Sequence, residues 1–317
     1  MGTQAGCEPC FIALKPVPRL LQTRSGTLKA VEPFVFQRSM DFLEGFGPMA
    51  GEQLIGDGAL TKAMIVDGRV VVFRVRDEGT GGSALSYELF SEDKLDDRSA
   101  KAAEDRISFF LSLDDDVQRF YSIAETDPAF YPKVRALWGL HHVKFPSLLE
   151  VSAWAIITQR IQQPVALRVM AALAEKYGGS LEVDGTMYWA FPDYQRLKVA
   201  TPKELRVLTG NQRTAVRLES LLKRFNELDE GFLRTAPYEK AAERLRVVQG
   251  IGKWSSQFIL FRGLGRIEKQ EYNTKPVLQM LKEVYGPEKT LDDINKAYGK
   301  WSGYWSLYLW GSAMTPR

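Results

Sequence analysis

The chain has 317 residues, of which 45% are hydrophobic and 26% are charged, a balance typical of a globular protein with a large core. No apolar run is long enough to cross a membrane, and residues 1–6 lack the segments of a signal peptide. We therefore expect an intracellular protein without a membrane partner, in the cytoplasm or nucleoid of a prokaryote or the nucleus of a eukaryote.

The two cysteines, Cys7 and Cys10, are spaced C-x-x-C, and the only histidines are His141 and His142. A zinc site would need two further ligands, and a redox motif would need a helix after the cysteines, where the sequence resembles the start of a strand. We expect reduced thiols, no metal site and no cofactor.

The first 104 residues are expected to form a domain in which an antiparallel sheet carries one or two helices on a face. Apolar segments at 63–66 and 70–75 flank Asp67-Gly68, the type of turn that joins two strands into a hairpin. The other elements expected in this domain are strands at 34–36 and 84–90, a helix across 42–54 and a glycine-rich loop at 77–83.

Residues 105–317 are expected to form helices throughout, which makes the fold class α+β. Apolar residues at helical spacing predict helices at 117–124, 130–137, 145–163, 167–177, 218–225 and 274–285. Thr201 is expected to cap a further helix, with Pro202 in its first turn.

A hairpin between two helices, at about 238–262, organises this region. Its turn, Gly250-Ile251-Gly252, permits positive φ and close approach of another molecule to the backbone. The free amides at the start of the second helix, together with Lys253, predict an anion site that suits a phosphate. The charge distribution agrees: residues 1–110 hold 13 Lys and Arg against 16 Asp and Glu, whereas residues 111–317 hold 29 against 23.

The stretch G-I-G-K-W-S-S at 250–256 resembles the helix-hairpin-helix DNA glycosylases, most closely the alkylbase type, 3-methyladenine DNA glycosylase II. The resemblance extends over nearly the whole chain. It implies a partner, double-stranded DNA with damaged bases, and an activity: flipping out alkylated purines and hydrolysing their N-glycosidic bonds. We expect the protein to act as a monomer.

The resemblance also implies which residues bind DNA. Gln159 would probe the minor groove at the lesion, and Arg160 would take the wedge position, where the family often has an apolar residue; alternatively Arg160 is an ordinary surface residue. The implied phosphate contacts, from the hairpin and from a second turn, are Gly250, Ile251, Gly252, Lys253, Ser255 and Arg213.

The base pocket implied by the resemblance consists of Trp254, Phe258 and Trp310, because aromatic faces hold a flipped cationic base by stacking and cation–π attraction. Trp254 stands where the 8-oxoguanine branch has its Schiff-base lysine. The resemblance therefore implies a monofunctional glycosylase rather than a lyase. Core packing is the alternative role for the aromatic residues of the last helix.

Asn273 stands where the family has its catalytic aspartate. An amide has neither the charge nor the basicity with which a carboxylate stabilises an oxocarbenium-like transition state. The residue would also cap the following helix well. Asn273 is either natural or an introduced substitution, and Glu271 or Glu268 are alternative sources of the missing carboxylate.

Two other functions stay open. The first is a non-catalytic DNA-binding protein that senses damage on the glycosylase fold. The second is a hairpin that serves protein contacts only, which predicts no salt-dependent DNA binding.

Overall fold

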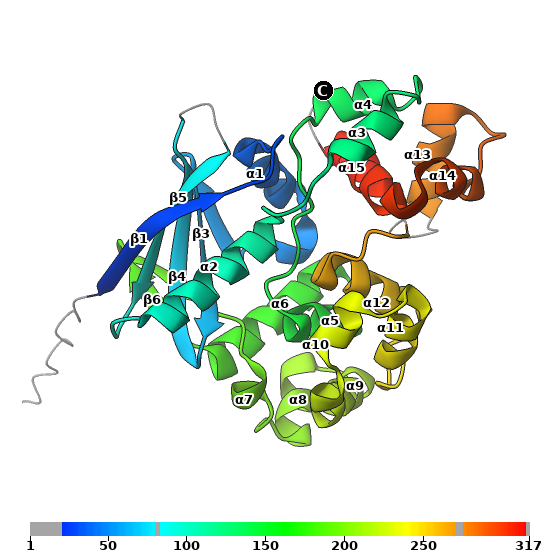
Figure 1. The fold of residues 1–317 in the computed structure, drawn as a ribbon. Coiled ribbons are helices and arrows are strands. Elements are labelled where there is room, and N and C mark those ends of the chain that lie inside the picture. The colour runs from blue at the N-terminus through cyan, green and yellow to red at the C-terminus, as the bar shows by residue number, and fades with distance from the viewer. Residues whose placement is uncertain (1–20, 80–82, 270–274, 315–317) are drawn as a thin grey trace, which may run out of the picture.

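The structure is a computed structural model that describes residues 21–79, 83–269 and 275–314. A five-stranded antiparallel sheet near the N-terminus is followed by a mostly helical region, which confirms the expected fold class (Figure 1). The strands are β1 (Gln22–Lys29), β2 (Gln53–Gly56), β3 (Ala59–Val66), β4 (Arg69–Asp77) and β5 (Ala84–Ser91), in the spatial order β1-β5-β4-β3-β2.

The predicted turn at Asp67-Gly68 joins β3 to β4, with Val66 opposite Arg69. Both turn residues have positive φ, 46° for Asp67 and 75° for Gly68, as a two-residue hairpin of this type requires. Every residue of β3 and the middle of β4 are buried, so both faces of the sheet are covered at this hairpin. Its two strands lie inside the sheet, with β5 on one side and β2 on the other.

The expected strand at 34–36 is wrong, because Phe36 begins the helix α1 (Phe36–Gly45). Three apolar residues fit the buried start of a helix as well as a short strand. The expected helix at 42–54 is correct only in part: a short 3-10 helix, η1 (Gly47–Met49), follows α1, and the chain enters β2 at Gln53. The expected loop at 77–83 is shorter, since β4 extends to Asp77, and residues 80–82 lie outside the described residues.

Helix α2 (Asp97–Leu111) packs against the sheet and spans the expected domain boundary after residue 104. The Asp96 side chain caps it by accepting a hydrogen bond from the Ser99 amide at 2.7 Å. The helices that follow are α3 (Gln118–Ala124), α4 (Tyr131–Ala136), α5 (Leu148–Ile157), α6 (Gln163–Leu173), α7 (Tyr194–Leu197), α8 (Pro202–Thr209), α9 (Gln212–Arg224), α10 (Glu230–Thr235), α11 (Tyr238–Leu245), α12 (Lys253–Phe258), α13 (Lys275–Tyr285), α14 (Leu291–Tyr298) and α15 (Ser302–Met314).

Two expectations for this region are corrected. The expected long helix at 145–163 is shorter: α5 ends at Ile157, and a turn at 158–162, whose Arg160 has a φ of 61°, separates it from α6, which overlaps the helix expected at 167–177. The region is also not helical throughout. Strands β6 (Ser180–Val183) and β7 (Thr186–Trp189) form a hairpin, and its core residues pack together with residues of β3 and β4.

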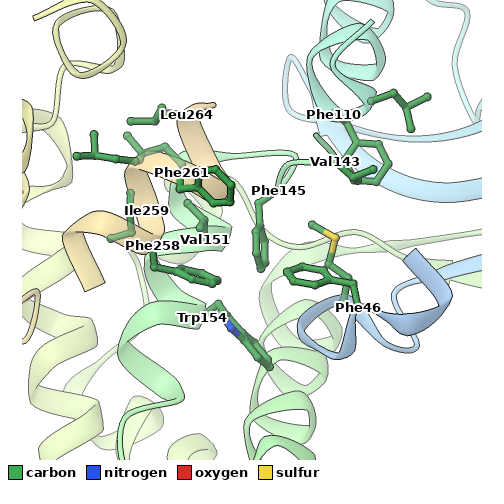
Figure 2. Close-up of a cluster of buried hydrophobic side chains, with 14 of the residues drawn as sticks. Phe46, Phe110, Val143, Phe145, Val151, Trp154, Phe258, Ile259, Phe261 and Leu264 are labelled. Atoms are coloured by element: carbon green, nitrogen blue, oxygen red, sulfur yellow. The ribbon is translucent and has the colours of Figure 1, made fainter. Parts of the chain in front are cut away.

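Figure 1 shows α5–α12 gathered in one group and α3, α4 and α13–α15 in another. Aromatic side chains join the first group to the segment after α1, as Figure 2 shows. The ring of Phe145 lies 6.4 Å from that of Phe46 and 5.9 Å from that of Phe258 on α12. This packing fixes α12, and therefore the hairpin, on the rest of the protein.

Candidate nucleic-acid interface

A groove of about 590 Å³ lies over the hairpin between α11 and α12. Its lining includes four cations, Arg160, Arg217, Arg246 and Lys253, and no carboxylate. The rest of the lining is Gln159, Val248, Gln249, Gly250, Ile251, Gly252, Trp254 and Ser255. A concave surface with charge of one sign attracts a polyanion.

The hairpin turn has the backbone that its glycines allow. Gly250 has a φ of 98°, and the Ile251 amide donates to the Val248 carbonyl at 3.0 Å while its side chain is buried. Gly252 precedes α12 and is exposed, and a Cβ there would meet nothing within 4 Å. Gly252 thus leaves open space at the start of α12, whose first residues, Lys253, Trp254 and Ser255, line the groove.

Gly250 is required for a different reason. A Cβ at this position would lie 2.6 Å from Cγ of Arg217, a residue of α9. The stem of Arg217 therefore packs directly on the turn, and the Gln249 amide donates to Ser220 of the same helix at 3.1 Å. Helix α9 is the support on which the hairpin rests.

Gln159 connects three parts of the site. Its Nε2 donates to the Gly250 carbonyl at 2.6 Å and to Ser255 Oγ at 3.2 Å, and its Oε1 accepts from Arg217 at 2.6 Å. Both ends of the amide are thus bonded within the protein, and Ser255 is buried. The structure brings Gln159 and the hairpin together, and it shows the side chain holding the hairpin to α5 and α9.

Arg160 is the next residue in the same turn and is exposed. A non-glycine residue with a φ of 61° is in the left-handed region, which costs about 1 kcal/mol or more and is often found at functional sites. Because Gln159 is fixed by its hydrogen bonds, Arg160 projects from a rigid point at the edge of the groove.

Two of the expected base-pocket residues stack on each other. The rings of Trp254 and Phe258 are 5.3 Å apart with an interplanar angle of 15°. Trp254 is 41% exposed and lines the groove, whereas Phe258 is buried against Phe145. The pair therefore places a partly exposed indole at the groove with a buried ring stacked against it.

Trp310 lies on α15, outside the groove lining, and is half-buried against the main core. Its Nε1 is buried and has no hydrogen-bond partner within the part of the chain that the structure describes. The helix places Trp305 and Tyr308 in the core, as expected for its other aromatic residues.

Asn273 and Glu271 lie outside the described residues, as do Cys7 and Cys10. Glu268 is described, and Arg266 donates to it at 2.7 Å through Nε while also donating to the Leu233 carbonyl. The carboxylate of Glu268 thus forms a partly buried ion pair with Arg266, just before the described residues break off at 269. Helix α13 starts at Lys275 and is fixed at its far end, where Tyr285 donates to Asp127 at 2.7 Å.

Arg213 stands in the first turn of α9, where its amide donates to Asn211 Oδ1 at 2.9 Å. It is exposed and lies outside the groove lining, one helical turn before Arg217 and on the same face of the helix. Arg217 and Arg246 belong to the site but were not expected. No local pattern marks either residue, because their roles depend on contacts between segments distant in sequence.

The described residues contain no helix long and apolar enough to span a membrane, and no group of three or more His, Cys, Asp or Glu side chains suited to a metal ion.

No family profile matches the chain. It is 27% identical over 218 residues to the DNA-3-methyladenine glycosylase of Bacillus subtilis, an alignment that covers 63% of this chain and 69% of that protein. It is 34% identical over 112 residues to DNA-3-methyladenine glycosylase 2 of Escherichia coli, which covers 34% of this chain and 38% of the relative.

Solved structures share the fold. The 3-methyladenine DNA glycosylase of Archaeoglobus fulgidus superposes with a TM-score of 0.75 at 20% identity, covering 92% of this chain and all of that one. The 8-oxoguanine glycosylase/lyase of Clostridium acetobutylicum gives a TM-score of 0.68 at 19% identity, covering 92% of this chain and 98% of that one.

Proposed function

We propose that this protein binds damaged duplex DNA and is built to release alkylated purines. The proposal is supported by the similarity of its sequence and its fold to helix-hairpin-helix DNA glycosylases of the 3-methyladenine type. The observation that carries the proposal is the groove over the hairpin. Four cations, a partly exposed tryptophan and the uncovered backbone at Gly252 meet there without any carboxylate.

The groove suits a DNA strand. Phosphates would contact the backbone at Gly250, Ile251 and Gly252 and the charge of Lys253, while Arg213 would meet the backbone further along. Arg160, held at the groove edge, would enter the stack that a flipped nucleotide vacates, where its planar guanidinium can lie between bases. Gln159 would hold the turn against the hairpin while Arg160 enters the base stack.

The base site would use the partly exposed indole of Trp254, which stacks on Phe258, together with Trp310 on α15. A purine that carries an alkyl group on a ring nitrogen is cationic, and an electron-rich ring attracts it. Because residue 254 is Trp rather than Lys, this position offers no amine for a Schiff base, and the chemistry would be the single-step hydrolysis of a monofunctional enzyme.

Asn273 decides how much catalysis the chain provides. Breaking the glycosidic bond creates positive charge on the sugar, which a carboxylate stabilises and an amide does not. The cationic base is already a good leaving group, so we expect slow excision. The second candidate function, a DNA-binding damage sensor that does not cut the bond, is favoured by this same residue.

The test is single-turnover release of base from duplexes that carry 3-methyladenine or 7-methylguanine. The chain as given is compared with Asn273→Asp, and DNA binding is measured for both across a salt series. We expect Asn273→Asp to excise at least about a hundredfold faster, within the range attributed to one electrostatic group in a transition state.

Four outcomes decide whether either function holds. Faster excision by the Asp variant supports a glycosylase with a blunted catalytic position. Equal excision by both proteins would move the catalytic carboxylate to another residue, and Glu271→Gln would be examined next. Salt-dependent binding without excision by either protein would establish the sensor, and the absence of binding would overturn both proposals.

A further inference from the structure

A second cavity, of about 380 Å³, lies away from the hairpin, between edge strand β2, helix α6 and the β6–β7 hairpin. We call it the α6 pocket. Its lining shares no residue with the groove. It comes from residues 50–54, from Lys62 of β3, from α6 and the two residues after it, and from the β6–β7 hairpin and Phe191. Its size is within the range of small-molecule sites.

The walls and rim of the α6 pocket are apolar and aromatic. Three large apolar side chains at its rim are about half exposed: Leu54 at 50%, Met187 at 48% and Trp189 at 43%. Tyr188 and Phe191 add two further rings. An exposed apolar cluster on a concave surface is typical of a ligand site, and three aromatic residues around one cavity are typical of sites for organic cations.

The floor of the α6 pocket is polar and buried. Lys62 is only 4% exposed, and its Nζ lies 2.8 Å from Glu52 Oε2. The side chain of Glu52 is 19% exposed, so it is the member of this pair that a ligand N–H can reach.

The charge balance of the α6 pocket determines whether it favours a positively or a negatively charged ligand. The charge of Lys62 is neutralised by Glu52 at hydrogen-bond distance, so the carboxylate of Glu175, which is exposed, leaves the lining with a net negative charge. A cation gains from this excess and from the aromatic faces, whereas an anion would be repelled.

We propose that the α6 pocket binds a small organic ammonium ion with an apolar or aromatic body, whose charge is held by the carboxylates of Glu52 and Glu175 and whose body lies among Tyr188, Trp189 and Phe191. This site is separate from the proposed glycosylase function, and it does not depend on DNA.

The test uses tryptamine as the probe, with isothermal titration calorimetry on the full chain. Tryptophol and indole-3-propionate keep the indole but carry a neutral and a negative group instead of the ammonium. We expect tryptamine to bind with a dissociation constant of about 1 mM or tighter, and the two analogues to bind at least about tenfold more weakly.

Two variants locate the site without disturbing the buried ion pair. Ala171→Phe fills the pocket from the exposed side of α6, and Glu175→Gln removes the unneutralised charge. We expect the first to abolish tryptamine binding and the second to weaken it about tenfold, a change of about 1.4 kcal/mol. The matched control is Val207→Phe on α8, a position that is 74% exposed and outside the lining.

The far-ultraviolet circular dichroism spectrum and the melting temperature of all three variants should equal those of the parent chain, which confirms that each is folded. The proposal is overturned if tryptamine binds Ala171→Phe as it binds the parent, if the neutral or anionic analogue binds as well as tryptamine, or if no probe binds more tightly than about 10 mM.

Discussion

The groove over the hairpin and the α6 pocket use the same kinds of residue in opposite ways. In the groove, Lys253 and Arg160 are exposed, and no carboxylate shares the lining. In the α6 pocket, Lys62 is almost fully buried and ion-paired with Glu52. The cations of the groove therefore favour an external polyanion, whereas the charge of Lys62 is satisfied inside the protein and contributes little to the field outside it.

The same contrast holds for backbone and packing. The groove exposes the backbone at Gly252, where no side chain lies within 4 Å of a Cβ position, whereas the α6 pocket is shaped by apolar and aromatic side chains. Perturbing the groove should thus change DNA binding, and perturbing the buried charges near the α6 pocket should change stability. Three changes test this difference.

The largest effect is expected at the two glycines of the hairpin. Gly250→Ala places a methyl group 2.6 Å from Cγ of Arg217 at a φ of 98°, so we expect unfolding to become easier by about 2 kcal/mol or more. Gly252→Ala meets nothing within 4 Å at an allowed φ of −92°, so its stability should change by less than about 0.5 kcal/mol.

Both glycine variants should lose affinity for duplex DNA, measured by fluorescence anisotropy. The methyl group of Gly252→Ala stands at the expected phosphate contact, and that of Gly250→Ala displaces the stem of Arg217 beneath the turn. The loss should be about tenfold for Gly252→Ala and larger for Gly250→Ala, which also displaces Arg217. A Gly252→Ala protein that binds DNA as tightly as the parent would show that no phosphate approaches the turn.

The second effect concerns Glu150, a buried residue of α5 near Lys62 and Glu52. Burial and the neighbouring Glu52 carboxylate raise the pKa of Glu150 to about 8, although the charges of Lys62 and Arg106 oppose the shift. Between its unfolded pKa, near 4.5, and about pH 8, the folded chain holds a proton that the unfolded chain has lost. The stability from this proton is complete below the unfolded pKa and is lost as the pH rises through 8.

Glu150→Gln retains the shape of the side chain but has no proton to lose. Between pH 6 and pH 8, the parent should therefore lose about 2 kcal/mol of unfolding free energy relative to this variant in urea denaturation. Glu175→Gln is the control, because Glu175 is exposed and its curve should run parallel to that of the parent. Parallel curves for Glu150→Gln as well would mean that Glu150 is ionised in the folded protein.

The sequence predicted the parts of the fold whose signals are local. The turn at Asp67-Gly68 was predicted correctly, and so was the helix capped by Thr201, where the side chain and Glu204 form a capping box. The β6–β7 hairpin carried the same kind of signal, with Asp184 and Gly185 both at positive φ, and it was missed because its strands have only four residues each.

The site was predictable only where a motif marks it. The glycine hairpin and the Trp254–Phe258 pair follow from residue type and spacing within one segment. The end of α5 at Ile157 was not predicted, because the run from Trp154 to Ile161 contains no glycine or proline. Pro164, in the first turn of α6, is the one local signal that a new helix begins there. The contact of Arg217 with Gln159 joins residues 58 positions apart, which no local pattern encodes.

The smallest effect is expected for Arg217→Met, which keeps an apolar stem beneath Gly250 but removes the charge and the hydrogen bond to Gln159. Affinity for undamaged duplex should fall about tenfold near 0.1 M salt, and the slope of log K against log salt should decrease by about one. Arg224→Met, on the same helix but paired with Glu227 at 3.1 Å, is the matched control and should change neither quantity measurably. If the slope stays constant while affinity falls, Arg217 acts only by orienting Gln159, and a double-mutant cycle with Gln159→Leu should then show a coupling of about 0.5 kcal/mol or more. A changed slope together with that coupling would show that one arginine both supports the hairpin from within and contributes charge to its surface.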